Sequence, residues 1–438
     1  MPPSYDNSIS VPAPAHANRR QTDGKEVSEP KGIVKLILFF WFLRLFKPEW
    51  IAAYYFPSLA FLKPIPTLLL LVFMAYMILK SNKVQLDKPM LAFALVCLAS
   101  TIGSVNTGIS WPILRWCFET LIFFSFAQTI IKSEKSIKRL LCLYLSSFVV
   151  FSVWGIIDGG KVNACVALND EDYFGPFMTL GIPLSYFLMA SAQRGSWLKR
   201  ASFVSFLLSI AGAVASFKRG TFLSLLLVLG YMFFRSQNKA RYFARGCAVV
   251  FVVLILAVTL FSGFFERYEN EMSTIVTKGA NEGTGKDRMY LWTQALKMFA
   301  DNPVLGIGPG CFGFKIQSYI TREEADQWGV RYQMYGRAIH NIYIEILSEM
   351  GSLGFIAFLS LLVVFRKRNL AVRQAVDAVK QPYSSMHYYA LAIEGGMIAL
   401  LVNGYFYNLT YSAWLWDLMI LNTILYQRIK HLEGGLMR

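Results

Sequence analysis

The sequence predicts an all-α polytopic membrane protein with about twelve transmembrane helices, and three observations carry this prediction. Of its 438 residues, 55% are hydrophobic and only 16% are charged, and the mean hydropathy is +0.43. Apolar runs of ~20 residues, the length that a helix needs to cross a bilayer, recur along the chain. The connections between these runs alternate between basic and neutral or acidic. This composition excludes an ordinary soluble globular domain.

The predicted spans have boundaries that are accurate to a few residues. The first run contains Arg44, Lys47, Pro48 and Glu49, so we expect a broken helix or a short pair of helices there. Two crossings must precede Lys80 if the basic connection that begins there faces the cytoplasm. The predicted spans, in chain order, are about 36–58, 64–79, 90–105, 113–131, 140–157, 173–192, 201–217, 219–234, 246–265, 347–365, 389–407 and 411–427.

The formal net charge of +16 does not indicate nucleic-acid binding, because the excess charge lies in short connections beside the apolar runs. Lys132, Lys135 and Arg139 are examples. Short basic connections remain in the cytoplasm, and this rule places both termini there. By contrast, residues 158–172 are acidic, and the long segment 266–338 has equal numbers of acidic and basic residues. Both are therefore expected on the outer side.

The same pattern divides the chain into four parts. Residues 1–32 are polar and unlike a cleaved signal peptide, so we expect a disordered cytoplasmic tail. Residues 33–265 hold the first nine predicted helices, and residues 266–338 form the large outer loop. Residues 339–438 hold the last three helices and a cytoplasmic tail.

The six cysteines are scattered, form no Cys-x-x-Cys pair and mostly lie in or beside apolar runs. They are interpreted as small buried hydrophobic residues. The outer connections contain no Asp, Cys and His pattern that is typical of a metal site, so we expect no metal.

The outer loop is expected to contain its own helices, because unstructured loops of this length are uncommon. Met289, Trp292, Ala295, Leu296 and Phe299 have helical spacing, and the sequence Asp-Asn-Pro then ends the helix. This pattern predicts an amphipathic helix on the outer membrane surface, with its aromatic side chains facing lipid or the helical bundle. Two segments that resemble phosphate-binding loops lack residues that the full motifs require and are interpreted as turns; they are 282–288 and 306–310.

Ionisable side chains beside apolar runs indicate function, because they are costly at membrane depth. Lys218 and Arg219 lie between two apolar runs on the outer side, where basic residues are not expected. The alternative is a pair that anchors the hairpin by reaching the membrane surface. Arg288 begins the predicted surface helix, and its alternative is a solvated charge or an ion pair with Asp287.

His340 is the only histidine on the predicted outer side. A histidine titrates near neutral pH and can take a proton from an attacking hydroxyl. Asn341 can orient it or cap the following helix. Glu345 and Glu349 lie four residues apart on one helical face. The alternative is a structural histidine at a helix start.

The sequence His340-Asn341, followed by nine residues and then Gly351-x-x-Gly354, resembles the signature of bacterial O-antigen ligases and the related O-antigen polymerases. The two glycines are expected to let another helix pack closely. The resemblance covers about residues 160–365, and three further segments carry it: 168–178, 218–220 and 288–312.

The resemblance implies a membrane fold like that of the C-type glycosyltransferases, with inward termini and one large periplasmic loop. It implies an enzyme of the bacterial inner membrane that moves a glycan from undecaprenyl diphosphate to an acceptor hydroxyl at the periplasmic face, without a metal or other cofactor. The implied partners are membrane lipids, the undecaprenyl-diphosphate-linked glycan donor and an acceptor, which is lipid A core, a glycan or a protein.

The resemblance also implies roles for particular residues. Arg219 and Arg288 would bind the lipid diphosphate, because guanidinium groups match phosphate oxygens. Lys218 and Arg337 are weaker candidates for the same task. His340 would act as general base or position the acceptor hydroxyl.

Further residues would complete this site. Asn341 would hold the hydroxyl. Direct attack on the sugar would invert the anomeric centre, and a covalent intermediate on Glu345 or Asp170 is the alternative. The aromatic and charged residues of 314–337 would stack on sugars or pack the loop itself.

Several functions remain open at this point. The leading hypothesis is a ligase, and the alternatives within the superfamily are a polymerase and a protein O-oligosaccharyltransferase. A transporter of lipid-linked glycan is the alternative from another class, but the chain lacks the paired repeats that are typical of transporters. Convergence of Arg219, Arg288 and His340 within about a nanometre, around a cavity, would favour the transferase.

Overall fold

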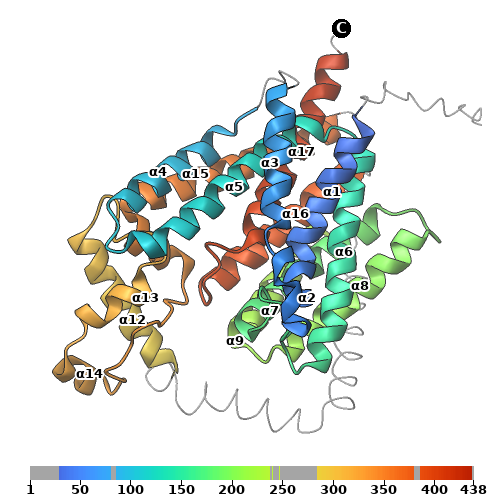
Figure 1. The fold of residues 1–438 in the computed structure, drawn as a ribbon. Coiled ribbons are helices and arrows are strands. Elements are labelled where there is room, and N and C mark those ends of the chain that lie inside the picture. Colours follow the sequence, from blue (N-terminus) through green and yellow to red (C-terminus); the bar gives the residue numbers. More distant parts are fainter. Residues whose placement is uncertain are drawn as a thin grey trace, which may run out of the picture.

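The computed structural model describes residues 29–79, 85–236, 284–378 and 385–436, with residues 239 and 246 between them. The expected N-terminal tail, the predicted ninth span at 246–265 and the start of the outer loop therefore lie mostly outside the described residues. The described residues form helices and no strand (Figure 1). The helices are α1 (Lys31–Phe46), α2 (Pro48–Tyr55), η1 (Pro57–Leu62), α3 (Ile65–Leu79), α4 (Lys88–Ile102), α5 (Thr107–Ile130), α6 (Glu134–Ile157), α7 (Glu171–Ser191), α8 (Trp197–Ala215), α9 (Arg219–Arg235), α12 (Thr284–Asp301), α13 (Phe312–Lys315), η3 (Ile316–Tyr319), α14 (Arg322–Trp328), α15 (Ile342–Ala378), α16 (Ser385–Gly404) and α17 (Ala413–Leu436).

The predicted all-helical membrane fold is confirmed. Within the described ranges, 7 helical segments are long and apolar enough to cross a membrane. They are Pro57–Leu79, Thr107–Ile130, Glu134–Ile157, Glu171–Ser191, Trp197–Ala215, Ile342–Val376 and Ser385–Gly404. The total of about twelve spans stays a prediction.

The first predicted span is a broken pair, as its sequence indicates. α1 ends at Phe46, Lys47 adopts a left-handed conformation with φ of 51°, and Pro48 begins α2. Proline fits the first position of a helix but disfavours the helical conformation in the residue before it. The break therefore follows from the Lys-Pro sequence, and it occurs beside the cavity described below.

α7, α9 and α16 are held together by a small polar network inside the bundle. The Asn403 side-chain amide donates to the hydroxyl oxygens of Thr179 and Ser224, each at 2.8 Å. These three residues belong to α16, α7 and α9 respectively. Because buried polar groups need partners, the network fixes how the three helices pack. It thereby positions the first turns of α7 and α9, which carry charged residues of the candidate site.

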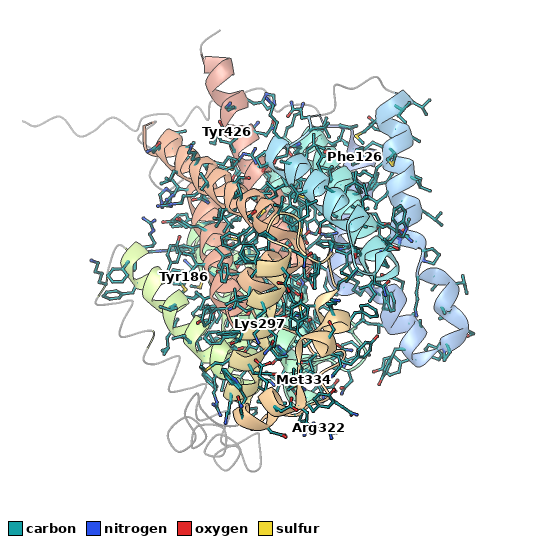
Figure 2. The ribbon with its side chains drawn as sticks, turned by 90° about the vertical axis from the view of Figure 1, so that its left-hand side faces the viewer. Phe126, Tyr186, Lys297, Arg322, Met334 and Tyr426 are labelled. Carbon is teal, nitrogen blue, oxygen red and sulfur yellow. The ribbon has the colours of Figure 1, made fainter. Side chains whose placement is uncertain are left out.

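The segment from α12 to α14 forms a small hydrophobic core of its own, at one side of the molecule and apart from α8 (Figure 1). Figure 2 shows Lys297 and Arg322 of this segment, and Met334 just after it, toward the end of the molecule opposite Phe126 and Tyr426. The helix predicted over 289–299 is present as α12. It begins at Thr284, so the interpretation of 282–288 as a turn is wrong from that residue onward.

The buried face of α12 differs from the apolar stripe that the spacing indicates. Tyr290, Leu291 and Met298 are buried, whereas Met289 and Leu296 are exposed. The reason is that the chain after α12 folds back and packs on it, so the loop's own core selects the buried face. Spacing alone cannot distinguish this face from one that faces a membrane.

α15 is kinked at Gly351, where φ is 65° and ψ is −166°. The segment 303–308 fills the kink with backbone hydrogen bonds. The N–H groups of Ile307 and Gly308 donate to the carbonyls of Ser348 and Glu349 at 3.0 and 2.9 Å, and the Ser352 N–H donates to the Pro303 carbonyl at 2.8 Å. We call the segment 303–308 the strap.

The expected role of the two motif glycines is therefore corrected. A Cβ at Gly351 would collide with the backbone of Val304 and Leu305, so this glycine admits the strap and not a second helix. A Cβ at Gly354 would meet Met350 of the same helix. The predicted turn at 306–310 is present, and Gly306, Gly308 and Gly310 all have positive φ.

Candidate functional site

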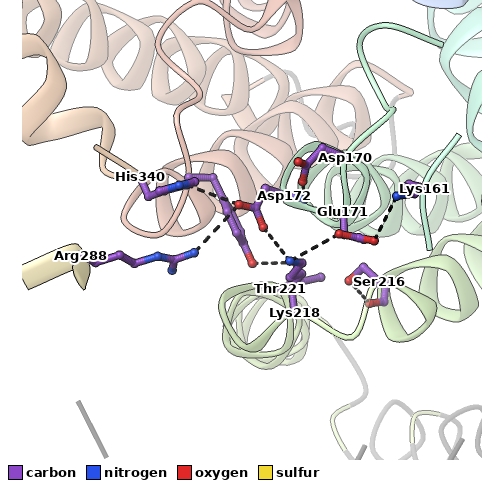
Figure 3. A network of polar contacts seen from close by, with 11 residues as sticks. Lys161, Asp170, Glu171, Asp172, Ser216, Lys218, Thr221, Arg288 and His340 are labelled. Atoms are coloured by element: carbon purple, nitrogen blue, oxygen red, sulfur yellow. Dashed lines mark hydrogen bonds and ion pairs between the residues drawn. The ribbon is translucent and has the colours of Figure 1, made fainter. Parts of the chain in front are cut away.

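A charged cluster forms around Asp172 at the start of α7. Its carboxylate lies 3.2 Å from Nζ of Lys218, 3.4 Å from Nδ1 of His340 and 4.0 Å from Nη2 of Arg288. Figure 3 shows His340 and Arg288 pointing toward Asp172 from one side and Lys218 from another. Residues from α7, the α8–α9 connection, α12 and the segment before α15 thus meet at one acidic side chain. We call these four residues the Asp172 cluster.

The start of α7 is built to present its acidic residues. Asp170 caps the helix, and its side chain accepts a hydrogen bond of 2.7 Å from the backbone N–H of Asp172. Negative charge is favourable in the first turn of a helix, because unpaired N–H groups give that end a positive potential. Glu171 lies 3.5 Å from Lys218 and 3.8 Å from Lys161.

Lys218 immediately precedes α9 and is held by two carboxylates. Burial lowers the pKa of its ammonium group, but Asp172 and Glu171 outweigh this effect, and the pKa lies above its ordinary value. Lys218 therefore remains charged at neutral pH. Arg219 follows it as the half-buried first residue of α9, so it lies at the same end of this helix.

His340 occupies a strained and well-held position. Its φ of 55° is uncommon for a residue other than glycine, and such strain is often found at functional sites. Its backbone N–H donates to Oδ1 of Asn408 at 2.5 Å. The neighbouring carbonyl of Ile339 accepts a 2.8 Å hydrogen bond from Nε1 of Trp292 on α12. These contacts fix the imidazole between α12 and the connection after α16.

The environment of His340 favours its neutral form. Burial is the largest cause, and the positive charge of Arg288 also lowers the pKa of the imidazole. Asp172 raises it, and Arg337 lowers it. The net pKa lies below 6.5. A neutral imidazole near pH 7 can accept a proton, as a general base must.

The remaining predicted residues lie around this cluster. The side-chain oxygen of Asn341 caps α15, accepting from the backbone N–H groups of Tyr343 and Ile344 at 3.0 and 3.1 Å. Arg337 lies 3.7 Å from Asp287. Arg288, by contrast, reaches Asp172 and makes no ion pair with Asp287 among the described residues.

Glu345 and Glu349 are buried one turn apart on α15. The Thr410 hydroxyl donates to Glu345. Glu349 accepts from the backbone N–H groups of Gly310 and Phe312 at 2.7 and 3.2 Å, and from the Tyr411 hydroxyl at 2.8 Å. Glu349 therefore ties the glycine turn and the start of α17 to α15.

A cavity of about 530 Å³ lies beside the Asp172 cluster. Three wall residues connect the two: Ile339 precedes His340, Tyr173 follows Asp172, and Asn408 binds the His340 backbone. The wall also contains cationic, acidic and aromatic side chains. They are Arg44, Lys47, Arg337, Glu345, Glu349, Trp116, Phe312, Tyr411 and Trp414.

The break between α1 and α2 supplies the cationic wall of this cavity. Arg44 pairs with the buried Asp417 at 2.6 Å, and its side chain is only 9% exposed. Its second terminal nitrogen, Nη2, is buried without a hydrogen-bond partner among the described residues. Lys47 makes no side-chain ion pair within the same ranges. Both cations therefore retain donors for a bound molecule.

Sequence reasoning missed four residues of this arrangement. Asp172 was noted only as part of an acidic connection, although an acidic side chain directly before an apolar run is a usable signal. Arg44 and Lys47 were noted only as interruptions of a span. Asn408 gave no signal. Within the described ranges, no three His, Cys, Asp or Glu side chains gather closely enough to hold a metal ion.

The helices and the Asp172 cluster define a multi-pass membrane protein with a charged site at one end of its bundle. Residues 204–359 match the family model described as O-antigen ligase. This match confirms the resemblance to the superfamily of O-antigen ligases and polymerases. The matched range includes Lys218, Arg219, Arg288, Arg337 and His340. No curated protein matches the chain.

Proposed function

We propose that the protein is an O-antigen ligase that moves a glycan from undecaprenyl diphosphate to an acceptor hydroxyl, such as one on lipid A core. One observation carries this proposal: Arg288, Lys218 and His340 converge on Asp172 beside a cavity of about 530 Å³. Cations suited to a diphosphate and a base suited to a hydroxyl thus lie together. This combination is what transfer between a lipid diphosphate and an alcohol requires.

The donor's diphosphate would bind to the cations of the cluster. Asp172 balances Lys218 and Arg288, and Arg288 is held at a loose distance of 4.0 Å. A phosphate oxygen that binds Arg288 would therefore replace only its weak contact with Asp172. Arg219, at the start of α9, would contribute a second guanidinium group. These charges would stabilise the negative charge that develops on the leaving diphosphate.

His340 would act as the general base. Its lowered pKa keeps the imidazole neutral at pH 7. The acceptor oxygen forms a bond to the anomeric carbon as the bond to the diphosphate oxygen breaks. The hydroxyl proton passes to Nε2 of His340, and the electron pair leaves with the diphosphate. Asp172, 3.4 Å from Nδ1, would stabilise the imidazolium that results.

The positions of the other acidic residues favour direct transfer over a covalent intermediate. Asp170 is engaged as the cap of α7, and Glu345 accepts a hydrogen bond from Thr410. Glu345 lines the cavity, where it would accept hydrogen bonds from sugar hydroxyls. The rings of Tyr173 and Trp414 would pack against sugar faces. Direct attack would invert the anomeric centre.

We further infer that this end of the bundle faces the periplasm of a bacterial inner membrane. Residues 266–338 would then be the periplasmic loop. Residues 33–265 and 339–438 would supply the spans, and the segment 1–32 would be a cytoplasmic tail. The site would receive both the lipid-linked donor and the acceptor from the outer leaflet.

The first test is a reconstituted transfer assay. Purified protein is incubated with an undecaprenyl-diphosphate glycan and lipid A core, and variants His340→Ala and His431→Ala are compared. His431 is the matched control, because it is exposed near the end of α17. We expect product on lipid A core from the wild type and from His431→Ala, and loss of product from His340→Ala.

Other outcomes would change the conclusion. Lengthening of the glycan on its undecaprenyl carrier would identify a polymerase. Transfer to a protein hydroxyl would identify a protein O-oligosaccharyltransferase. Movement of lipid-linked glycan across a bilayer without any transfer would contradict the proposal.

A further inference from the structure

A second charged cluster lies at the end of α9 opposite to Lys218. It is centred on Glu394 of α16. Arg366 of α15 contacts one carboxylate oxygen of Glu394, and Arg373 of α15 lies 3.3 Å from the other. Arg235, the last residue of α9, lies 3.7 Å from the same oxygen, which also accepts a 3.0 Å hydrogen bond from Tyr231. Since α9 has 17 residues, the two clusters are separated by ~25 Å along the helix.

The positive charge of this cluster is not balanced. Among the described side chains, Glu394 is the only acid that pairs with Arg235, Arg366 or Arg373. Three guanidinium groups therefore share one carboxylate. The Nε of Arg373 is buried and has no hydrogen-bond partner in the described ranges. Such an arrangement retains donors for a further anion.

Two of the three arginines are accessible from the surface of the protein. The side chain of Arg366 is 50% exposed and that of Arg235 is 37% exposed, whereas that of Arg373 is only 9% exposed. Arg373 thus anchors Glu394 from within. Arg235 and Arg366 form the accessible part of the cluster.

Exposed apolar stripes lead along both helices to these arginines. On α15, Ile356, Leu359 and Val363 are exposed and share one face with Arg366. On α9, Leu227 and Phe234 are exposed, the latter by 75%. Exposed apolar side chains on membrane helices contact acyl chains. Each stripe therefore brings lipid tails to a point where a guanidinium group can reach the headgroup.

We propose that Arg235 and Arg366 bind the phosphate of an anionic phospholipid, with its acyl chains along the α9 and α15 stripes. Guanidinium groups match phosphate oxygens, and basic pockets between membrane helices bind acidic headgroups. A soluble phosphate would satisfy the arginines but would not use the apolar stripes, so a lipid fits the surface better. The site is independent of the Asp172 cluster and of glycan transfer.

The test measures lipid binding directly. Purified full-length protein in neutral detergent is titrated with phosphatidylglycerol or with phosphatidylcholine, and bound lipid is counted by native mass spectrometry. The test variant is Arg235→Gln with Arg366→Gln, which retains the buried Arg373–Glu394 pair. The matched control is Lys138→Gln with Arg139→Gln, which removes the same charge from two exposed residues of α6.

We expect the wild type and the control to retain phosphatidylglycerol at least tenfold more tightly than the test variant, and phosphatidylcholine to bind weakly to all three. Equal retention by the test variant and the control would overturn the proposal. So would equal binding of the two lipids by the wild type, a comparison that stands even if the variant does not fold. Displacement of the lipid by an equal concentration of inorganic phosphate would identify a soluble-anion site instead.

Discussion

Asp172 contacts more of the proposed machinery than any of the residues that the sequence indicated. It lies within 4.0 Å of Lys218, Arg288 and His340, which come from three other parts of the chain. A carboxylate among cations has two tasks here. It prevents the cations from repelling one another, and it would stabilise His340 once protonated.

We expect Asp172→Asn to reduce transfer by ~100-fold, in the range that acid–base residues contribute. The shape of the side chain is retained, but the charge opposite His340 is lost. The initial rate of glycan transfer measures the effect. Asp158→Asn is the control, because Asp158 accepts from Asn163 in the α6–α7 connection and makes no contact with His340. Equal rates for the two variants would exclude a catalytic part for Asp172.

The pH dependence of transfer follows from the lowered pKa of His340. The neutral imidazole is the active form, so activity rises with pH through this pKa, and the midpoint should lie below 6.5. The contribution to stability has the same sign. The unfolded chain binds the proton more readily between the two pKa values, so folded stability is lost as pH falls through this window.

Arg337→Gln tests the cause of this shift. Arg337 lowers the pKa of His340, so its removal should move the acidic limb of the pH–rate profile to higher pH. The limb of kcat/KM is measured for wild type and variant. An Arg337→Lys variant retains the charge and should retain the wild-type midpoint. A midpoint that falls in Arg337→Gln would contradict the electrostatic account.

At the scale of elements, the kink of α15 is where the chain that follows α12 packs against the helical bundle. Gly351 has a backbone conformation that other residues rarely adopt, and the strap leaves no room for a Cβ. We expect Gly351→Ala to lower the free energy of unfolding by ~3 kcal/mol or more, since backbone strain and a collision with backbone add together. Thermal unfolding in detergent measures the change.

Gly230→Ala is the matched control for this prediction. Gly230 lies within α9, and a Cβ there would meet nothing within 4 Å. Because alanine favours a helix by ~1 kcal/mol over glycine, this variant should be as stable as the wild type or more so. Equal destabilisation by both substitutions would mean that the strap does not depend on Gly351.

The break between α1 and α2 makes a prediction about substrate affinity. Lys47→Met should raise the KM for a glycan substrate by ~10-fold or more, because a hydrogen bond to a charged group contributes about 1.5–3 kcal/mol. The steady-state KM for donor and acceptor would show which substrate Lys47 meets. Lys63→Met is the control, since its ammonium group lies over the Trp50 ring outside the cavity. An unchanged KM for both substrates would remove Lys47 from the site.

The contrast between three elements shows what a sequence can predict. The α1–α2 break was predictable, because Lys-Pro is a local signal. The buried face of α12 was not, because residues that follow it in the loop decide which side is covered. The kink at Gly351 was indicated only as a glycine, and its partner, the strap, is about 45 residues away along the chain.

At the scale of the whole molecule, the proposed orientation can be measured. Arg322 begins α14, in the proposed periplasmic loop. Lys138 lies near the start of α6, at the predicted cytoplasmic end of this helix. On intact cells, a membrane-impermeant maleimide should label Arg322→Cys and leave Lys138→Cys unlabelled until the cells are opened. Among the described cysteines, Cys97, Cys117, Cys165 and Cys311 are buried and Cys142 is half-buried, so labelling of the wild type is measured as the background. The reverse pattern would overturn the orientation.

The fold class and most helices were predictable from composition and apolar runs, whereas the site was predictable only in part. His340, Arg288 and Lys218 were indicated by their unusual positions and by the family resemblance. Their convergence on Asp172 could not be predicted, because Asp172 and His340 are far apart in sequence and meet only through the packing of α7, α9 and α16. The cavity arises from the same long-range packing.

The strap joins the α12–α14 segment to the first half of α15. Arg288 is carried by α12 and His340 precedes α15, and the hydrogen bond from Trp292 to the Ile339 carbonyl couples the two. Asp172 and Lys218 belong to a second part of the molecule, formed by the starts of α7 and α9. Since Arg288 and Lys218 approach Asp172 from these two parts, a diphosphate bound to both cations would bridge them.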